Sequence, residues 1–281
     1  MMQRLPVLVA LTAAVLLAAC SEGASSGLDS RYAVDRPVRV VLIVDESDIN
    51  IATSIEGVVL VTGTFDSDRY EHNVTFDGAV VRVRVQRKRS LLSLVRTGGA
   101  EVRVRVPAGT EFEVVATDSN VTVEAGPIGG GSIETTNGIV SVRGGNGDLR
   151  VRNNKGSVMV SDQHGALDVE TIAAAVSVVD HVGGPVKILT DNASIDFHGE
   201  IGEDGESEMA TTNGAIILNL AGQPSIALDA VAENGSVRSQ FAILDGSRGP
   251  AAISGRIAGG ASPLRLRTTN GLIDVKSAEL Q

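Results

Sequence analysis

The sequence predicts an all-β fold, a single-stranded β-solenoid (β-helix) of roughly 18–21-residue coils with an irregular N-terminal β region. Three observations support this expectation. A polar turn followed by alternating apolar residues recurs along the chain. Between these repeats, no segment long enough to form a helix shows the 3.6-residue periodicity of apolar residues. The 281 residues include no Trp, 2 Tyr and 5 Phe. Because aliphatic side chains can stack on their equivalents in the next coil, we expect a narrow core of Val, Ile and Leu.

The repeat is clearest from about Asp118 onward, and its turn residues give the period. The repeats start at Ser119, Gly138, Gly156, Ala174, Ala193, Gly214, Gly235 and Gly271. Successive starts are 19, 18, 18, 19, 21, 21 and 36 residues apart, and fifteen of the sixteen residues two and four places after a start are apolar. Alternation with a period of two indicates a half-buried strand. The last spacing is twice 18, so we expect one degenerate coil or a loop near Ala251–Ile257.

A second short strand precedes the turn in most repeats, so each coil holds two strands. These strands are Leu149-Arg150-Val151, Leu167-Asp168-Val169, Val186-Lys187-Ile188 and Leu264-Arg265-Leu266. Asn-Gly pairs, which supply the positive φ angles of a sharp corner, stand at Asn137, Asn213, Asn234 and Asn270. Since stacked asparagines can bond to one another up a column, we interpret them as a structural ladder rather than as a polar binding face.

Turns and strands together resemble a known family. The phrase Val106-Pro107-Ala108-Gly109-Thr110, the alternating strand after it and the repeated Thr-Asn-Gly-x-Ile/Val strands are similar to the bacterial putative-adhesin family of uncharacterised β-solenoid domains. The resemblance covers the chain from about Val38 to Val275. It implies a β-solenoid of adhesin-like character and carries over no catalytic residues, because the motifs of this family are structural.

The first nineteen residues predict a secretion signal. Arg4 is followed by an apolar run from Val7 to Leu17, which is shorter than the roughly 20 residues needed to span a bilayer. The run ends in Leu17-Ala18-Ala19-Cys20, which resembles the lipobox of bacterial lipoproteins. The resemblance implies that Cys20, the only cysteine, becomes the lipidated first residue of the mature protein and attaches it to a membrane.

These features divide the chain into four expected parts. Residues 1–19 form the lipoprotein signal peptide, 20–36 the lipidated cysteine and a flexible tether, 37–118 an N-terminal β region or cap, and 119–281 the solenoid repeats; 37–281 as one continuous domain is the alternative. Ser21 follows the anchor, where an Asp would resemble an inner-membrane retention signal. We therefore expect a lipid-anchored protein of the cell envelope, at the outer membrane rather than the inner one.

For function, we expect a non-enzymatic cell-envelope protein whose solenoid serves as a structural or interaction module. The alternatives are a β-helix enzyme that acts on polysaccharides and an envelope protein that handles lipids. The enzyme needs charged groups aligned on outward positions of adjacent coils, yet the position three places after each repeat start shows no column of acids, and the chain has no Trp for a carbohydrate cleft. We expect no cofactor and no nucleic-acid partner.

One segment is strongly basic, although the whole chain carries a formal charge of −10. Its candidate partner-binding residues are Arg82, Arg84, Arg87, Lys88, Arg89, Arg103 and Arg105. Because Ala79–Val85 and Val102–Val106 both alternate, we expect them to pair as a hairpin that gathers four of the arginines on one face. Such a face could dock on anionic lipid, on lipopolysaccharide or on an acidic envelope protein. Neutralisation by the acidic remainder of the chain is the alternative.

Three histidines are spaced 17 residues apart, close to the coil period, and each has an aspartate nearby. His164, His181 and His198 would form a divalent-metal column if their coils stacked in register. Counted from the repeat starts they stand at places 8, 7 and 5, so the register drifts. We therefore expect no metal site and interpret the three as solvent-facing turn residues.

Overall fold

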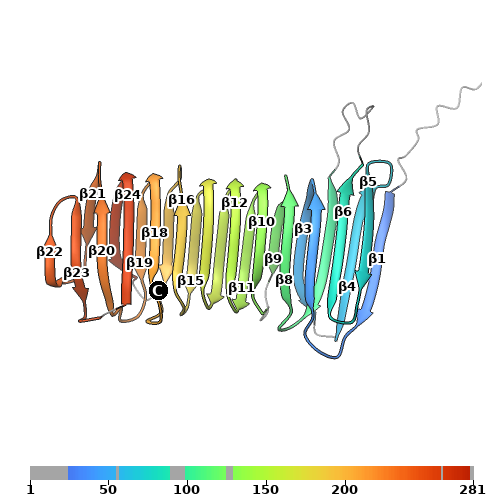
Figure 1. Cartoon of the computed structure of the whole chain (residues 1–281), viewed down its shortest axis with the longest axis horizontal. Coiled ribbons are helices and arrows are strands. Elements are labelled where there is room, and N and C mark those ends of the chain that lie inside the picture. Colours follow the sequence, from blue (N-terminus) through green and yellow to red (C-terminus); the bar gives the residue numbers. More distant parts are fainter. Residues whose placement is uncertain (1–24, 55–56, 89–98, 125–128, 261, 279–281) are drawn as a thin grey trace, which may run out of the picture.

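The computed structural model describes residues 25–54, 57–88, 99–124, 129–260 and 262–278, and all regular secondary structure in these residues is β. Twenty-five strands form two long sheets, which enclose a narrow core and give an elongated molecule (Figure 1). The predicted β-solenoid is confirmed. None of the described segments is a helix long and apolar enough to cross a bilayer.

We call the two sheets A and B. The twelve strands of sheet A are, in spatial order, β1 (Ser25–Ala33), β4 (Val58–Asp66), β7 (Ala100–Pro107), β3 (Ser47–Ser54), β9 (Asn120–Glu124), β11 (Val140–Asn146), β13 (Val158–His164), β15 (Val176–His181), β17 (Ile195–Gly199), β19 (Ile216–Leu220), β25 (Leu272–Ser277) and β21 (Ser236–Ser239). The thirteen strands of sheet B are, in spatial order, β22 (Leu244–Arg248), β23 (Ala252–Ile257), β20 (Ile226–Ala232), β24 (Ser262–Asn270), β18 (Ser207–Asn213), β16 (Val186–Thr190), β14 (Leu167–Ala173), β12 (Leu149–Lys155), β10 (Gly131–Asn137), β8 (Glu111–Thr117), β2 (Arg39–Asp45), β6 (Val80–Arg87) and β5 (Tyr70–Phe76).

Each regular coil contributes one strand to each sheet, and equivalent residues of neighbouring coils lie side by side. Val140 of β11 pairs in parallel with Val121 of β9 and with Val158 of β13. Neighbouring strands lie about 4.8 Å apart, so side chains of the same kind stack along the axis of the solenoid. This stacking is what the recurrence of apolar positions predicted.

The core is a column of aliphatic side chains between the two sheets. The fifteen apolar residues found two and four places after the repeat starts are all buried, with at most 5% of their surface exposed. Ser141 and the other residues between them point outward and are partly or fully exposed. One cluster of buried side chains runs from Leu28 to Val275, so residues 37–118 and the repeats after them share a core.

Glycine at the corners is required by the close approach of neighbouring coils. Gly138 has a φ of +137° and Gly156 a φ of +116°, a region that side chains disfavour. A Cβ on Gly138 would lie 2.1 Å from the carbonyl oxygen of Ser119 in the adjacent coil. A larger residue would therefore have to push the coils apart.

At both ends of the solenoid the coils depart from chain order. The first coil, β2–β3, lies between β8–β9 and β6–β7, and the last coil, β24–β25, lies between β18–β19 and β20–β21. The 36-residue spacing therefore reflects a reordering of coils. Residues 244–257 form neither a coil nor a loop, because β22 and β23 make an antiparallel hairpin along β20.

Antiparallel strands and one arginine cover the ends of the two sheets. β1 and β4 follow β7 at the N-terminal end of sheet A, and β5 follows β6 in sheet B. At the C-terminal end of sheet A, the guanidinium of Arg248 donates to the carbonyl oxygens of Ser239 and Phe241 at 3.1 Å and 2.7 Å, and Val237 N–H donates to Pro250 O at 2.9 Å. These contacts occupy backbone groups that would otherwise attract another strand.

β1 occupies residues for which the composition predicted a flexible tether, and that expectation is wrong for Ser25–Ala33. All nine residues pair with β4, from Ser25 opposite Asp66 to Ala33 opposite Val58. Leu28 inserts into the core and is 5% exposed. Edge pairing and one buried side chain therefore order a segment whose Ser- and Gly-rich composition is typical of a linker.

Candidate functional site

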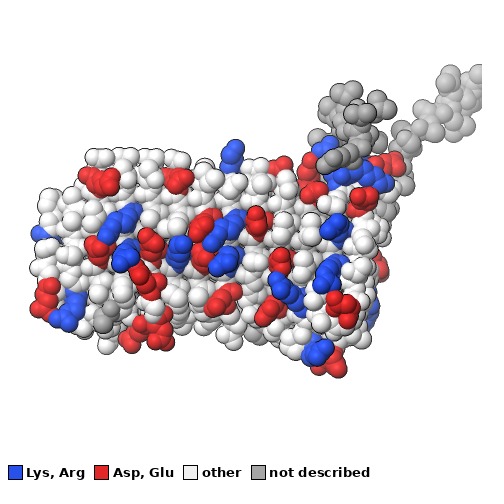
Figure 2. Space-filling model, in the orientation of Figure 1, with Lys and Arg blue, Asp and Glu red and all other residues white. Residues whose placement is uncertain are grey.

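The outward side chains of sheet B form a row of alternating charge. The row crosses six neighbouring strands, from β12 through β14, β16, β18 and β24 to β20, with its residues in register. In spatial order they are Arg150, Asp168, Lys187, Glu208, Arg265 and Asp229. We call these six residues the charged row. Figure 2 shows a band of mixed basic and acidic side chains along the long axis of the molecule.

A second outward row lies two residues further along the same strands. In the same spatial order it consists of Arg152, Glu170, Leu189, Ala210, Arg267 and Val231. Arg152 contacts Asp168 at 2.9 Å and Glu170 at 3.0 Å, so it joins the two rows. Arg267 pairs with Asp229 in the same way. Opposite charges on neighbouring strands stabilise a sheet by about 0.2–1 kcal/mol per pair.

The carboxyl group of Asp168 has the most basic surroundings in the charged row. Partial burial acts to raise its pKa, but the hydrogen bonds from Arg152 and the charges of Arg152, Arg150 and Lys187 outweigh burial and lower the pKa below its ordinary value. Arg150 lies 3.2 Å away. Asp168 is therefore an ionised partner of these cations and is poorly suited to act as a general acid.

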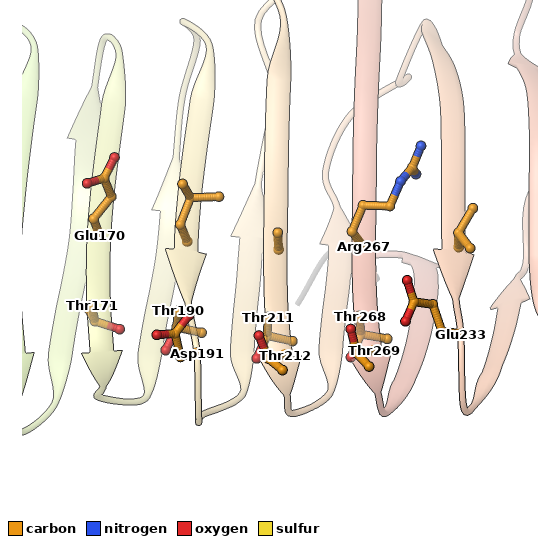
Figure 3. A pocket seen from close by; sticks show the side chains of 13 residues that line it. Glu170, Thr171, Thr190, Asp191, Thr211, Thr212, Glu233, Arg267, Thr268 and Thr269 are labelled. Carbon is orange, nitrogen blue, oxygen red and sulfur yellow. The ribbon is translucent and has the colours of Figure 1, made fainter.

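Where the second row is uncharged, the outer surface of sheet B is hollowed. Leu189, Ala210 and Val231 line a shallow groove of about 530 Å³. Figure 3 shows Glu170 and Arg267 on one side of it and, on the other, a rim of Asp191, Thr212, Thr269 and Glu233. The groove thus combines an apolar floor with a polar rim, and the small side chain of Ala210 leaves space at its centre.

The asparagines of the turns form the predicted structural ladder. Asn213 donates to the side-chain oxygen of Asn192 at 2.8 Å, Asn270 to that of Asn213 at 2.7 Å, and Asn234 to that of Asn270 at 3.1 Å. The ladder follows the spatial order of the coils, including the inserted last coil. Asn137, further along the solenoid, instead donates to a carboxylate oxygen of Asp118.

The three histidines do not form a column. His181 is fully buried, with Nδ1 2.8 Å from Glu200 O and Nε2 3.0 Å from Gly165 O, so the expected exposure is wrong for this residue. His164 is exposed and lies opposite Val182, one residue past His181. Because alternate residues of a strand face opposite ways, this drift separates the rings. In the described part of the chain, no group of three His, Cys, Asp or Glu residues could hold a metal ion.

The ring of His198 lies on the outer side, where its Nδ1 is 3.2 Å from a carboxylate oxygen of Asp180. Burial lowers the pKa of the His181 imidazole, while its two carbonyl contacts act to raise it. Both ring nitrogens of His181 face backbone carbonyl oxygens, and the neutral imidazole donates a hydrogen bond to one of them. His181 is therefore a structural residue that joins the corners of neighbouring coils.

The expected arginine hairpin is wrong. Arg82 and Arg84 stand on β6, which pairs with β2 and β5 in sheet B, whereas Arg103 and Arg105 stand on β7, which pairs with β3 and β4 in sheet A. The two pairs therefore lie on different sheets. Alternation shows which way a side chain faces but not which strand lies beside it, and here consecutive strands of one coil belong to opposite sheets.

Several residues of the basic segment already have partners. Arg82 contacts Asp77 at 2.7 Å, Arg87 contacts Glu46 at 2.5 Å, and Arg103 contacts Glu101 at 2.5 Å. Lys88 donates from Nζ to the carbonyl oxygen of Ser67 at 2.7 Å. Acidic neighbours thus neutralise part of the positive charge. Cys20 and Arg89 lie outside the described residues.

Arg87 and Lys88 share a corner of the molecule with the start of β1. Ser25, the first described residue, pairs with Asp66, and the turn that follows Asp66 receives the hydrogen bond from Lys88. In the same corner, Tyr70 lies opposite Arg87. One short turn therefore separates the start of the described chain from these two basic residues.

Comparison with known families identifies the fold. The Toastrack DUF4097 family model matches residues 39–276, from the start of β2 into β25. The chain belongs to this family. The match includes the charged row, the asparagine ladder and both inserted coils of this Toastrack protein. No curated protein shows significant sequence similarity to the chain.

Several solved structures resemble the Toastrack chain along most of its length at low identity. A putative adhesin from Parabacteroides distasonis is 12% identical, with a TM-score of 0.46, and the match covers 90% of this chain and 98% of that one. A putative adhesin from Bacteroides fragilis is 12% identical, with a TM-score of 0.38 and coverage of 90% and 99%. A putative lipid binding protein from Parabacteroides distasonis is 12% identical, with a TM-score of 0.37 and coverage of 91% and 98%.

The charged row is the surface feature that sequence reasoning missed. The position three places after each repeat start, which shows no column of acids, belongs to sheet A, whereas the charged row lies on sheet B. The signal was nevertheless present, because the central residues of the short second strands are Arg150, Asp168, Lys187 and Arg265. The charges of Arg150, Asp168 and Lys187, which belong to successive coils, alternate in sign.

Proposed function

We propose that the protein is a non-enzymatic interaction module of the bacterial cell envelope, held at a membrane by lipid on Cys20. The observation that carries this proposal is the corner at which the described chain starts. Ser25 pairs there with Asp66, and the turn after Asp66 leads to the contact of Lys88 with Ser67 and to Tyr70, which lies opposite Arg87. Cys20 precedes Ser25 by only five residues. Five residues span at most about 18 Å, so a lipid on Cys20 would hold this corner close to the bilayer.

The charges of the corner support the same orientation. A Lys or Arg at an anionic membrane surface contributes about 1 kcal/mol, and a single lipid-modified site is strengthened by a basic patch. Arg87, Lys88 and Arg89 are consecutive, and the first two lie at the corner. In this arrangement the two outer faces of the solenoid stay clear of the membrane and are open to partners, which suits an interaction module.

Lipidation is tested by the Cys20→Ser variant in cells fed labelled palmitate. The parent protein should take up label and remain with the membrane fraction, whereas the variant should take up none and become soluble or stay unprocessed. Equal labelling of the two forms would remove the lipid anchor from the proposal. A Ser21→Asp variant, which should still be labelled, separates lipidation from sorting between the two membranes.

The membrane-facing corner is tested separately with the unlipidated Cys20→Ser chain. It should bind vesicles that contain phosphatidylglycerol at low ionic strength, and replacement of Arg87, Lys88 and Arg89 by Ser should weaken that binding about 100-fold, at about 1 kcal/mol per residue. Replacement of Arg103 and Arg105 by Ser, on the outer face of sheet A, is the matched control and should have little effect. Equal losses in the two variants would contradict the assigned corner.

A further inference from the structure

The charged row has a symmetry that a single chain does not use. Its six residues read positive, negative, positive, negative, positive, negative from Arg150 to Asp229. Because the number of residues is even, reversing the row places a negative residue opposite every positive one and a positive residue opposite every negative one. We propose that sheet B docks face to face on sheet B of a second copy of this chain, around a two-fold axis.

The axis that reverses the row is parallel to the strands, lies in the interface and passes between β16 and β18. It places Lys187 opposite Glu208 of the second copy, Asp168 opposite Arg265 and Arg150 opposite Asp229, and it repeats each pair in the other direction. All six positions of the charged row then face an opposite charge. This is an isologous contact, in which the same patch of each chain is used.

The second row fits the same axis. Glu170 comes to lie opposite Arg267 of the second copy, and Leu189 opposite Ala210. Arg152 comes to lie opposite Val231 and keeps its intrachain partners, Asp168 and Glu170. The groove over Ala210 is where the surface is hollowed, and Leu189 is the apolar side chain beside it. Each copy thus fills the hollow of the other with a leucine, and apolar contact lies at the centre of the interface with charged pairs around it.

The ion pairs within the described part of one chain leave one of the two central residues of the charged row, Glu208, without a partner. Lys187 turns to Glu170 at 3.3 Å and Arg265 pairs with Glu206, although both flank Glu208 in register. Within the described residues, Glu208 forms no ion pair. Its carboxylate stands next to the proposed axis, where Lys187 of the second copy would meet it. Ion pairing within one chain explains the charges at the outer positions of the charged row, but it does not explain Glu208.

The size of the face is sufficient for a stable dimer. Around this axis, β18, β24, β20, β23 and β22 lie opposite β16, β14, β12, β10 and β8. Ten strands at about 4.8 Å extend for about 48 Å, and five residues of each strand extend for about 17 Å, which gives about 800 Å² for each copy. This is the usual contribution of one partner to a specific interface.

The dimer is also compatible with the proposed function. Rotation about an axis parallel to the strands preserves the strand direction, so the start of β1 lies on the same edge of the dimer in both copies. Both lipid anchors would then reach one membrane. This compatibility rests on the proposed anchor, whereas the charge and shape arguments for the dimer do not.

Two single charge reversals test the interface. Lys187→Glu places a glutamate opposite Glu208 of an identical copy, and Glu208→Lys places a lysine opposite Lys187. Each creates two like-charge contacts per dimer and should weaken association of the full chain about 100-fold or more. A one-to-one mixture of the two variants should associate again, because each facing pair is then one glutamate and one lysine. Sedimentation velocity in detergent measures both effects.

The mixture separates association from folding. If the reversals merely disrupted the ion pairs within each chain's charged row, mixing the two variants would not restore association. Circular dichroism of each variant shows whether it is folded. Asp196→Lys reverses an exposed charge on the outer face of sheet A and should leave association unchanged. A parent chain that is monomeric, single variants that associate like the parent, or a mixture that stays monomeric would each overturn the proposal.

Discussion

Replacing Val140 by Asp measures how strongly the inward column holds the coils together. Val140 is fully buried and is stacked between Val121 and Val158. Burial of a valine side chain contributes about 2 kcal/mol. A buried polar group without a hydrogen-bond partner costs about 1–3 kcal/mol more, and the stacked valines offer no partner. The neutral carboxyl form alone should therefore cost about 3–5 kcal/mol, which is a large part of a typical stability of about 5–15 kcal/mol.

The loss of folding stability caused by Val140→Asp should also increase with pH. Burial disfavours the charged form, so the pKa of the introduced carboxyl should lie above its unfolded value of about 3.9 in the folded chain. Between these two values the unfolded chain has released its proton and the folded chain has not. Destabilisation should then increase by about 1.4 kcal/mol for each pH unit, and it should level off above the folded pKa. The variant should be most stable in acid.

Urea unfolding followed by circular dichroism, at about pH 4 and pH 7, measures both quantities. Ser141→Asp is the matched control, because Ser141 is the next residue along β11 and points outward. Val140→Asn has nearly the same shape as the Asp variant but does not titrate. Similar losses in Val140→Asp and Ser141→Asp would refute the assignment of the faces. The absence of a pH difference between the Asp and Asn variants would refute the burial argument.

Three further predictions concern the corners and the ends of the solenoid. His181→Gln should cost about 1 kcal/mol or less, because Gln163 fills the same place one coil earlier and donates to Gly147 O at 2.5 Å. Since burial lowers the pKa of His181, the parent should lose stability as the pH falls below about 6.5, and urea titrations of the Gln variant should lack this dependence. Asn270→Ala removes the contacts of the ladder on both sides and should lower stability by about 1 kcal/mol in thermal melts; an unchanged melt would make the ladder incidental. Arg248→Ala exposes carbonyl groups beside β21 and should cause association that rises with concentration in light scattering, and this association should persist in a Lys187→Glu background.

The strand faces and the corner ladder were predictable because they are local. A period of two decides whether Val140 faces inward or outward whatever strand lies beside it, and Asn-Gly decides the corner. The order of the end coils was not predictable in this way. Val237 and Val275 are buried in the same column whether β25 or another strand lies next to β21, so their alternation carries no information about neighbours.

The charged row was only partly predictable for the same reason. Arg150, Asp168 and Lys187 belong to successive coils, so their alternation can be read directly from the sequence. Arg265 separates Glu208 from Asp229, and so preserves the alternation of charge, only because the last coil is inserted before β20. The arginines of β6 and β7 illustrate the converse, because alternation alone suggests a hairpin, whereas the topology places these two strands on different sheets.

The inserted end coils also change how the molecule would come apart. In a solenoid stacked in chain order, the last coil has one neighbour and can fray from its free end. Here β24 pairs with β18 on one side and with β20 on the other. A carboxypeptidase or a pulling force that acts on the C-terminus must therefore break the hydrogen bonds to both neighbouring strands at the same time. The outermost coil at that end, β20–β21, is continuous with the chain in both directions. Neither the inserted coil nor the outermost coil at this end can therefore unravel alone, so unfolding from the C-terminal side must break contacts of two coils together.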